Sequence, residues 1–507
     1  MVMSADSESV KVAIVGSGFG GLGTAIALKR AGIDDFVVLE RSDDVGGTWR
    51  ANTYPGCQCD VPSTLYSFSF APNPEWSHTF PFQQEIWDYL RWVTHEYGIA
   101  PHLRFGHEVT AGEWDDEAKR WMLETSSGRL DAQFVVLGVG ALSEPSFAAL
   151  PGLDRFEGTV FHSAEWNGEH DLTGERVAVI GTGASAIQFI PQIQPRVDAL
   201  QVYQRTPPWI MPHPDRPISR FERSLWRRFP RSQWLWRAGV YAAREALVLG
   251  LAIEPRLLAG VELIAKSHLR SQVPDPKLRS KLTPDYRLGC KRILISDDYY
   301  PALCQPNVEL VTGAVREVRP RSIVGGDGVE REVDTIICGT GFHVTSPPSA
   351  DYVRGRGGKV LSEAWRDGMS AYLGTTISGF PNAFMLSGPN TGLGHTSIVY
   401  MIESQVAYLI DALRTVDSTG ADALDVRPDV QAAYNDELQR KLQGTVWNTG
   451  GCKSWYLDQS GRNTTIWPSF TFAYRARTRK FDPAHYELSS RKLDEDRIAA
   501  LAGAAHH

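Results

Sequence analysis

The stretch Phe156–Ala186, FEGTVFHSAEWNGEHDLTGERVAVIGTGASA, contains the features that decide the fold. Its last part is an apolar run, Val177–Ile180, followed by a glycine turn and a helical pattern that continues to about Ile193. This order of strand, turn and helix is typical of a dinucleotide-binding unit, because the free N–H groups of the helix bind pyrophosphate. We predict that the cofactor-binding residues of this turn are Gly181, Thr182, Gly183, Ser185 and Ala186.

A similar turn lies near the start of the chain. The apolar run Val10–Val15 leads into the sequence GSGFGG, and a helical pattern follows over Leu22–Ala31. The next predicted strand, Phe36–Leu39, is followed by an acid that suits both ribose hydroxyls of an adenosine without a 2′-phosphate. The residues predicted to bind this dinucleotide are Gly16, Gly18, Phe19, Gly21 and Glu40.

The second unit lacks the corresponding acid. Its second predicted strand, Leu200–Tyr203, is followed by Gln204, Arg205 and Thr206. Without a carboxylate there is no repulsion toward a 2′-phosphate, and an arginine offers a planar set of donors for one. We therefore expect this site to prefer NADPH, with a surface charge as the alternative explanation of Arg205.

Two loops complete the predicted first site. A double glycine in the run Gly46-Gly47-Thr48-Trp49 would allow a second backbone approach to an extended cofactor such as FAD. Asp60 follows a Pro-Gly turn, and it either faces the cofactor or is a solvated turn residue. A loop at Gly388–Gly394 before the predicted helix Ser397–Leu413 suits the pyrimidine end of a flavin. We also count Val109 among the cofactor-binding residues.

These patterns predict an α/β protein with two dinucleotide-binding, Rossmann-like domains, the second inserted in the first, and a helical insertion. Two predicted strands that end in Gly-x-Gly, Phe134–Leu137 and Thr335–Cys338, mark the crossings between the domains. The expected boundaries are 1–140 and 343–507 for an FAD-binding domain, 141–210 and 290–342 for an NADPH-binding domain, and 211–289 for the helical insertion.

The composition limits the partners. A net charge of −7 gives no reason to expect nucleic acid as a partner. Six dispersed cysteines and a short polar start predict a reducing, cytoplasmic location without a disulfide framework. No apolar run is long enough to span a bilayer. The basic, aromatic segment Arg216–Arg237 favours the solvated face of a helical lid, with a helix on a membrane surface as the alternative.

The run Phe156–Trp166 resembles the signature of the type I Baeyer-Villiger monooxygenases, a family of class B flavoprotein monooxygenases within the flavin-containing monooxygenase superfamily. The run from Gly46 to Asp60 is similar to their second signature, and Lys291-Arg292 follows in family order. The chain departs from the family pattern at Asn167, where proline or aspartate is usual. The aromatic-lysine pair of related oxygenases that act on nitrogen and sulfur is also missing there.

The resemblance implies an NADPH- and O2-dependent FAD monooxygenase that turns ketones, and sulfides as a further substrate class, into oxygenated products through a C4a-peroxyflavin. It implies that Arg292 is catalytic beside the flavin, with Asp60 as its carboxylate partner. Lys291, Arg205 and Thr206 match positions that bind the 2′-phosphate, and Trp455 and Tyr66 match positions near the nicotinamide half and the flavin. The signature residues implied to form a hinge are Phe156, Gly158, His162 and Trp166.

Three other functions fit parts of the sequence. A flavin-containing monooxygenase could oxidise sulfur or nitrogen through a neutral hydroperoxyflavin, although an arginine that stays cationic beside the flavin favours ketone chemistry. A pyridine-nucleotide disulfide reductase would need a redox cysteine pair, and Cys57 and Cys59 are separated by a single residue. The remaining alternative is a non-catalytic NADPH-binding sensor. The sequence does not define the ketone or the oligomeric state.

Overall fold

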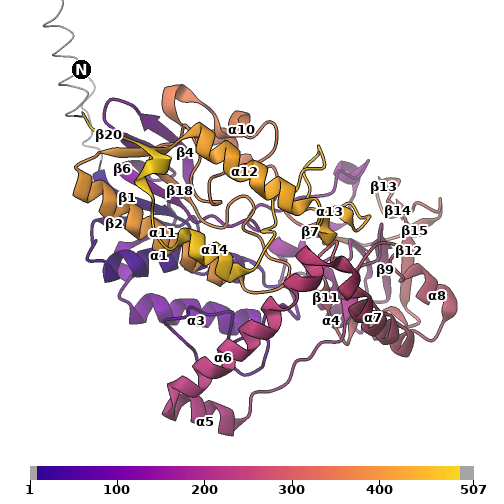
Figure 1. The fold of residues 1–507 in the computed structure, drawn as a ribbon. Helices are drawn as coiled ribbons and strands as arrows, with labels where there is room; N and C mark the ends of the chain where they lie inside the picture. Colours follow the sequence, from indigo (N-terminus) through magenta and orange to yellow (C-terminus); the bar gives the residue numbers. More distant parts are fainter. Residues whose placement is uncertain (1–7, 492–507) are drawn as a thin grey trace, which may run out of the picture.

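The computed structural model describes residues 8–491 and contains two large sheets, the first mixed and the second parallel, each with its own helices (Figure 1). The first sheet has the order β17-β4-β5-β6-β1-β2-β3, and β18 also pairs with β6. Its pairings around β1 and β6 are parallel, except that β4, β5 and β6 form an antiparallel meander. Its strands are β1 (Glu8–Val15), β2 (Phe36–Leu39), β3 (Leu103–Arg104), β4 (Val109–Asp115), β5 (Arg120–Thr125), β6 (Gly128–Leu137), β17 (Val353–Arg354) and β18 (Ala383–Met385).

Helices from distant parts of the chain cover this first sheet. The helix α1 follows the first glycine turn and packs on α11, which in turn packs on α14. Their apolar faces share one core with β1, as expected for a strand that is buried on both faces. The elements packed around the two faces of the first sheet are α1 (Phe19–Arg30), α2 (Thr48–Ala51), α3 (Gln83–Glu96), α10 (Leu361–Ala364), α11 (Ile398–Thr419), α12 (Pro428–Leu442), α14 (Thr471–Thr478) and the antiparallel pair β19 (Ala423–Val426) and β20 (Tyr486–Ser489).

The second sheet lies beside the first and has the order β12-β9-β8-β16-β7, with all four pairings parallel. Its strands are β7 (Thr159–His162), β8 (Arg176–Ile180), β9 (Ala199–Gln204), β12 (Val308–Thr312) and β16 (Thr335–Cys338). The helices α4 (Ala184–Ile193) and α9 (Tyr299–Leu303) pack on each other beside it. A small antiparallel sheet of β13 (Glu317–Arg319), β14 (Ser322–Val324) and β15 (Glu330–Glu332) follows β12.

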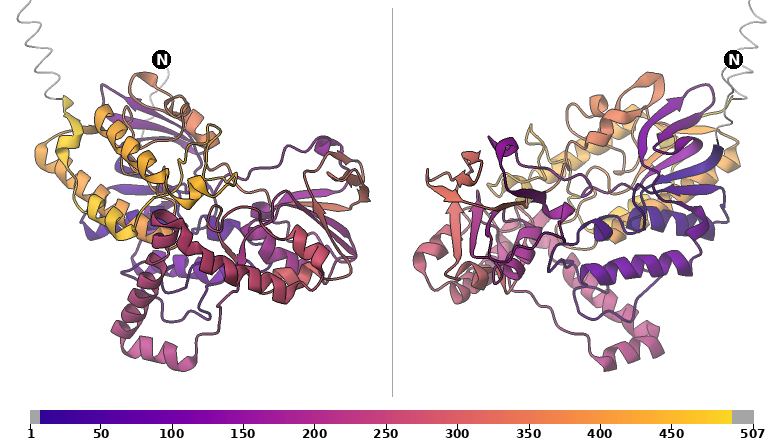
Figure 2. Two further views of the ribbon diagram at one scale, coloured as in Figure 1. Left: turned by 45° about the vertical axis from the view of Figure 1, so that its right-hand side comes forward. Right: turned by 180° about the vertical axis from the view of Figure 1, so that it is seen from behind.

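The remaining helices connect β9 to the segment that precedes β12. The first two, α5 (Arg220–Arg228) and α6 (Pro230–Glu245), form an arm that projects beyond α3 (Figures 1 and 2). A π-helical turn, Leu249–Ile253, then leads to α7 (Leu258–Gln272) and α8 (Pro276–Lys281). The parallel pair β10 (Ile210–Met211) and β11 (Leu294–Ile295) closes the base of this segment, and α13 (Val446–Thr449) lies next to it.

The predicted fold class is confirmed, because the chain forms two dinucleotide-type sheets and a helical section is inserted between β9 and β12 of the second sheet. The domain boundaries stay a prediction. Most predicted strands are present within a residue or two, but β6 begins earlier than predicted, at Gly128, because it pairs with β5 along its length. The helix α11 continues past the predicted Leu413 to Thr419, where Gly420 adopts the left-handed conformation that ends helices.

The prediction of no disulfide is wrong, because Cys290 and Cys452 are bonded. They are 162 residues apart in sequence, so their spacing carries no signal of pairing. Within residues 8–491, no helix is long and apolar enough to cross a membrane. The first seven residues, which include most of the polar start of the chain, lie outside the described part.

Candidate active site

The first glycine turn and the double glycine after β2 lie against each other. A Cβ atom on Gly47 would be 3.1 Å from the Cα atom of Gly18, and Gly46 donates its N–H to the carbonyl of Ser17 at 3.0 Å. Gly16 has a φ of +95°, and a Cβ atom there would meet the carbonyl oxygen of Gly138 at 2.9 Å. The helix α1 begins at this turn without a side-chain cap. The backbone therefore forms a cradle, free of side chains, that fits a pyrophosphate.

Glu40 lies at the mouth of this cradle. Its carboxylate accepts hydrogen bonds from the backbone N–H of Ser17 at 2.9 Å and from the Ser17 hydroxyl at 2.6 Å, and its other oxygen accepts from the N–H of Ser42 at 2.9 Å. These bonds fix the acid next to the turn. His107, two residues before Val109, donates its N–H to the backbone carbonyl of Glu40 at 2.9 Å, and a contact of Val109 with a cofactor stays a prediction.

Three aromatic side chains near the turn form one cluster. The indole of Trp49 donates to the hydroxyl of Tyr66 at 3.0 Å, and their rings are 5.4 Å apart. Phe19 lies on the other side of Tyr66 at 5.2 Å. Burial raises the pKa of Tyr66 well above its usual range, so this phenol stays neutral. Thr48, next to Trp49, donates its hydroxyl to the carbonyl of Leu142 at 3.4 Å.

The second glycine turn has the same backbone arrangement. Gly181 has a φ of +110°, and a Cβ atom there would be 2.4 Å from the carbonyl oxygen of Gly339. The helix α4 also starts without a side-chain cap, and a Cβ atom on Gly183 would meet nothing within 4 Å. Thr182 and Ala186 are buried, the latter in the core of the second sheet. This turn also fits a pyrophosphate.

The groups at the end of β9 differ from those at the end of β2. Gln204, which stands where the first unit has its acid, is buried and donates to the carbonyl of Lys281 at 2.9 Å. Its side chain therefore contributes to packing. Arg205 is exposed and lies close enough to Lys291 to affect it. Burial lowers the pKa of Lys291 and the charge of Arg205 lowers it further, while Asp285 opposes the shift. Two neighbouring cations on the edge of the turn suit an anion. Thr206, next to Arg205, is half-buried.

Asp60 and Arg292 come together although 232 residues separate them in sequence. Both carboxylate oxygens of Asp60 accept hydrogen bonds from the guanidinium, each at 2.6 Å. The third guanidinium nitrogen donates to the carbonyl of Leu393 at 3.0 Å. Burial by itself would raise the pKa of Asp60, but the charge and hydrogen bonds of Arg292 outweigh it, and the pKa is lowered. Burial acts against the cation of Arg292 too, yet Asp60 raises its pKa, so both groups stay ionised.

The loop that holds Asp60 is attached to the second nucleotide unit. The amide of Gln188, on α4, donates to the carbonyl of Gln58 at 2.9 Å and accepts from the Tyr54 hydroxyl at 3.0 Å. Gly56 has a φ of +77°, and a Cβ atom there would be 2.8 Å from the backbone oxygen of Gln188. The helix that follows the second turn therefore positions the acid that follows the first.

Buried polar groups without a partner surround the pair. Within residues 8–491, the hydroxyl of Tyr456, the Nδ1 atom of His395 and the hydroxyl of Thr396 are buried and form no hydrogen bond. Tyr456 is close enough for Asp60 and Arg292 to affect it, and burial raises its pKa to about 12. Buried polar atoms normally have partners, so these three fit a site that receives a ligand.

A second cation lies near the pair. Burial lowers the pKa of Arg244, on α6, and the charge of Asp60 opposes that shift. The next residue, Glu245, accepts from the Thr471 hydroxyl at 2.7 Å and is hydrogen-bonded to Nε2 of His395 at 3.1 Å. Although burial acts to raise the pKa of Glu245, these bonds lower it. The inner end of the projecting arm therefore belongs to the wall of the site.

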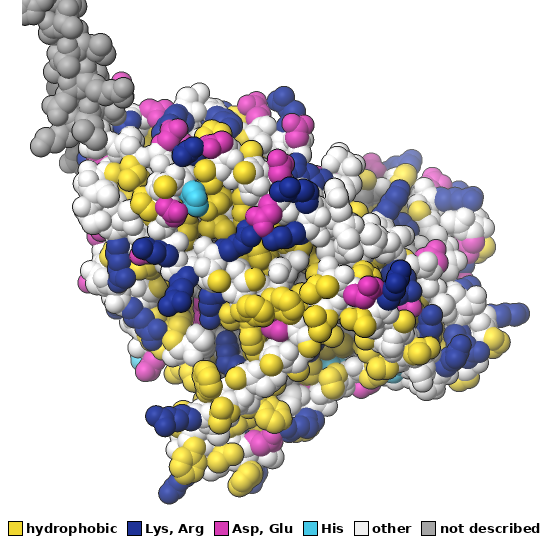
Figure 3. Space-filling view, in the orientation of Figure 1, with side chains coloured by type: hydrophobic (Ala, Val, Ile, Leu, Met, Phe, Trp, Pro, Cys, Tyr) yellow, Lys and Arg dark blue, Asp and Glu magenta, His cyan; other side chains and the backbone are white. Residues whose placement is uncertain are grey.

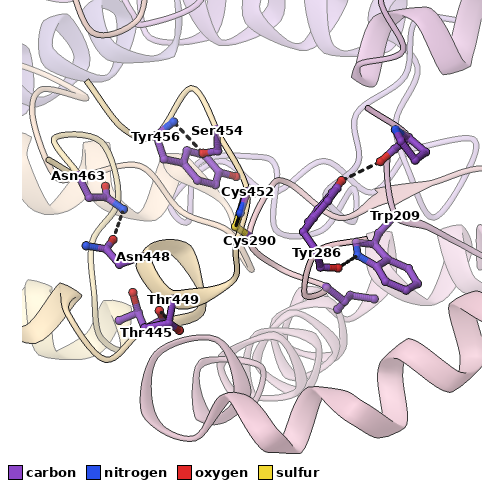
Figure 4. Close-up of a disulfide and its surroundings, with 12 residues drawn as sticks. Trp209, Tyr286, Cys290, Thr445, Asn448, Thr449, Cys452, Ser454, Tyr456 and Asn463 are labelled. Carbon is purple, nitrogen blue, oxygen red and sulfur yellow. Dashed lines mark hydrogen bonds between the residues drawn. A yellow bond between two sulfur atoms is a disulfide. The ribbon is translucent and has the colours of Figure 1, made fainter. Parts of the chain in front are cut away.

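The disulfide connects two segments of this wall (Figure 4). Cys290 precedes Lys291 and Arg292 directly, while Cys452 lies on the loop that holds Trp455 and Tyr456. The two aromatic rings on that loop are 4.4 Å apart, and that of Trp455 is 46% exposed. The bond thus ties the residue predicted to contact nicotinamide to the segment of the predicted catalytic arginine.

The signature residues lie elsewhere, at the junction of the two sheets. His162 ends β7 opposite Cys338, with its Nδ1 atom accepting the N–H of Ala164 at 3.1 Å. Its ring lies 5.9 Å from that of Phe342, at a chain crossing, and burial lowers its pKa. Trp166 packs on Phe189 of α4 at 5.3 Å. Within residues 8–491, no hydrogen bond or ring contact joins either residue to the Asp60–Arg292 pair.

The start of the signature is fixed by its backbone. A Cβ atom on Gly158 would be 2.1 Å from the carbonyl oxygen of Asp334 and 2.6 Å from the ring of Phe156. Phe156 packs against the core on the outer side of the second sheet. This segment is therefore closely packed at the base of β7. Its role as a hinge stays a prediction.

Sequence reasoning missed several members of the site. Gln188, Arg244 and Tyr456 belong to no motif, and their roles depend on contacts between distant segments. One sequence signal did point to this region. The loop Gly388–Gly394 was assigned to the cofactor, and it contains Leu393, whose carbonyl accepts the hydrogen bond from Arg292.

Known proteins show the same organisation. A family model described as pyridine nucleotide-disulphide oxidoreductase matches residues 13–220. A Baeyer-Villiger monooxygenase of Streptomyces coelicolor is 54% identical over 482 residues, which cover 95% of this chain and 93% of that protein. The chain belongs to the Baeyer-Villiger monooxygenases.

Solved structures support the same assignment. The closed crystal structure of cyclohexanone monooxygenase matches with a TM-score of 0.85 and 28% identity, over 96% of this chain and all of the other. A crystal structure described as an OTEMO complex with FAD and NADP matches with a TM-score of 0.84 and 26% identity over the same shares. The family is thus shown both by sequence and by fold.

The disulfide reductase alternative does not fit the cysteines near the first turn. Cys57 and Cys59 are both buried free thiols. Burial raises the pKa of Cys57 to about 12 and that of Cys59 well above its usual value. Thiol–disulfide exchange requires a thiolate, which neither group forms near neutral pH. Ketone oxygenation therefore remains the better explanation of the site.

Proposed function

We propose that this enzyme is an NADPH- and O2-dependent FAD monooxygenase that converts ketones into esters or lactones. The observation that carries the proposal is the pairing of Arg292 with Asp60 between the two glycine turns. The family assignment gives the reaction type, and the bonded pair gives the charge that this reaction needs.

The two cradles take different cofactors in this proposal. FAD would occupy the first, where the turn at Gly16–Gly21 would hold its pyrophosphate, Glu40 its ribose, and Trp49 and Tyr66 its ring. NADPH occupies the second, with its 2′-phosphate on Arg205, Thr206 and Lys291. The carboxylate of Glu40 beside the first turn and the two cations beside the second support this order, because a carboxylate repels a 2′-phosphate and cations attract it.

The reduced flavin supplies the electrons that activate O2, and the chain supplies the electrostatic environment for the transfer to a ketone. Arg292 stabilises negative charge on oxygen without giving up its proton, since a guanidinium stays protonated near neutral pH. Asp60 holds the guanidinium plane in one orientation through two charge-assisted bonds. The Leu393 carbonyl fixes the third nitrogen, so that the cation cannot rotate away.

The other proposed roles concern position. His162 and Trp166 pack at the junction of the sheets and would guide their relative movement, while Trp455 would cover the nicotinamide half of NADPH. The proposed domain boundaries place Asp60 in the FAD-binding part and Arg292 in the NADPH-binding part. A cytoplasmic location agrees with this use of NADPH and stays a prediction.

A product assay with two substrate classes tests the proposal. The purified yellow protein is incubated with NADPH, 18O2 and either a cyclic ketone or an aryl methyl sulfide. We expect a lactone that carries one 18O atom and NADPH consumption that rises when the ketone is added. Sulfoxide without any lactone would instead support the flavin-containing monooxygenase alternative, and flavin that stays oxidised under anaerobic NADPH would indicate a non-catalytic protein.

A further inference from the structure

The helix α6 buries two polar side chains and exposes large apolar ones, although its Val240 and Tyr241 pack against the core. Gln233 is 4% exposed and Glu245 is 5% exposed. In contrast, Trp234 is 62% exposed and Leu235 is 65% exposed. A helix on the surface of a protein in water normally buries its apolar stripe and exposes its charges. The outer face of α6 therefore lacks the apolar partner that its sequence calls for.

The inward polar residues are firmly held. Gln233 donates to the carbonyl of Asn73 at 2.6 Å, and Arg237 donates to the carbonyl of Ser67 at 3.1 Å. Glu245 pairs with His395 in the wall of the active site. The sequence-based expectation of a solvated charged face is thus wrong for Arg237. These bonds fix the rotation of α6, so Trp234 and Leu235 stay on its outer side.

The apolar face continues beyond α6. About half of the strongly exposed large apolar side chains in residues 8–491 lie between 221 and 264, which is less than a tenth of the chain. Figure 3 shows apolar side chains over the projecting arm and along the adjoining helices, with lysines and arginines at the edges. We call this surface the arm face. Its exposed large apolar residues are Phe221, Phe229, Trp234, Leu235, Trp236, Leu249, Ile253, Leu257, Leu263 and Ile264. So large an exposed apolar surface marks an interaction site.

The charge of the arm indicates the kind of partner. Residues 216–237 contain seven arginines and one glutamate, in a chain whose net charge is −7. Arg220, Arg228 and Arg231 are exposed, and no carboxylate within residues 8–491 forms an ion pair with them. A second copy of the chain, related by a two-fold axis, would bring the same positively charged patch to the contact, which is unfavourable. The charges instead complement an anionic surface.

We propose that the arm face is a peripheral attachment site for an anionic lipid bilayer. Exposed tryptophan, phenylalanine and leucine side chains would enter the interface between headgroups and acyl chains, while the flanking arginines would bind lipid phosphates. The arm lies in the plane of the interface and does not cross it, in agreement with the lack of a membrane-spanning helix in the described residues. This inference concerns attachment and does not depend on the proposed reaction.

Vesicle sedimentation with the full-length flavoprotein tests the proposal. The protein is mixed with vesicles of phosphatidylcholine alone or with about one third phosphatidylglycerol at low and physiological salt, since salt screens such attraction. We expect binding to the anionic vesicles and weaker binding at higher salt. Binding should fall at least tenfold in Trp234→Ser/Leu235→Ser, and roughly fivefold for each arginine removed in Arg228→Gln/Arg231→Gln. The control Val329→Ser/Tyr352→Ser, which alters equally exposed apolar residues off the arm, should bind like the parent.

The bound flavin spectrum and the NADPH oxidation rate show that each variant is folded. Absence of binding to the anionic vesicles, or equal binding by parent and Trp234→Ser/Leu235→Ser, would overturn the proposal. Light scattering provides a second decisive readout. A dimer of the parent that dissociates in Trp234→Ser/Leu235→Ser would assign the arm face to a contact between copies and would also overturn it.

Discussion

The two glycine turns share a backbone arrangement, and the groups around them differ. In each, the first glycine has a positive φ and lies against the carbonyl of a glycine at a chain crossing, Gly138 for Gly16 and Gly339 for Gly181. At the end of the next strand, the first unit places the carboxylate of Glu40 on the turn, while the second places a buried amide and an exposed arginine. We propose that the turn provides a pyrophosphate cradle and that the group at the strand end determines which dinucleotide each unit binds.

A further difference is the contact each unit gives to the other. The loop after the first turn supplies Asp60, and a segment after the second supplies Arg292. Each half alone would leave a partly buried charge without a counterion, which is costly. The site is therefore complete only when both units are docked.

The third position of each turn gives the largest expected effect. Gly21 stands in the first turn, where a Cβ atom would be 1.8 Å from the carbonyl oxygen of Gly16, whereas Ala186 stands in the second. We expect Gly21→Ala to force the strand and helix apart, with a cost of about 3 kcal/mol and loss of bound flavin. Ala186→Gly is the matched control and should cost about 1 kcal/mol with flavin retained. Flavin content after gel filtration measures this. Equal flavin in both variants would contradict the packing difference.

Loss of the disulfide gives the next largest expected effect, and it should affect the second site but not the first. Cys290→Ser should lower the free energy of unfolding by about 2–4 kcal/mol, because the bond closes a long loop. It should also raise the KM for NADPH and leave flavin content unchanged, since the bond positions Lys291 and the Trp455 loop. Cys304→Ser, at an exposed free thiol, is the control. Thermal unfolding and NADPH titration give the readouts. A loss of flavin with an unchanged KM for NADPH would show that the disulfide supports the first site and not the second.

The arginine at the second strand end gives a smaller and more specific effect. Arg205→Ala should raise the KM for NADPH roughly 10- to 100-fold, the value of a charge-assisted phosphate contact, and leave that for NADH nearly unchanged. Steady-state kinetics with both coenzymes measure the ratio. A similar rise for the two would exclude a contact with the 2′-phosphate.

The smallest expected effect is a pH dependence. Burial and Arg205 lower the pKa of Lys291, so its positive charge is lost at a lower pH than for an ordinary lysine. NADPH binding should therefore weaken by up to about tenfold as the pH rises through that pKa, while NADH binding changes little. Lys291→Met should bind NADPH weakly at every pH and show no such step. An identical pH profile for both coenzymes would argue against the role of Lys291.

The sequence predicted the parts of this molecule that local patterns encode. The strands β2 and β16 have the predicted bounds, because short apolar runs next to glycine turns define them. Glu40 and the paired glycines were predicted from spacing alone, and the structure places them together at the first turn, while their contact with a cofactor stays a prediction. The disulfide could not be found, since Cys290 and Cys452 meet only after the C-terminal loop folds back on the second unit.

The pairing of Asp60 with Arg292 came from family resemblance and not from the residues themselves. On spacing alone, Asp60 fits a solvated turn and Lys291-Arg292 a charged edge. Their contact requires the Gln188 bonds that attach the Asp60 loop to α4, and these connect segments 130 residues apart. The exposure of Trp234 and Leu235 on α6 could not be predicted either. The sequence pattern shows which residues share a side of the helix, but not which side faces the protein.

The central claim is that the cation of Arg292, held by Asp60, directs oxygen to the ketone. The most direct measurement is the amount of ester formed per NADPH consumed by Arg292→Ala, with Arg155→Ala as the control at an exposed site. The account predicts that Arg292→Ala still reduces its flavin with NADPH, while the ester yield falls by about 100-fold or more and hydrogen peroxide appears instead. An ester yield like that of the parent enzyme would contradict it.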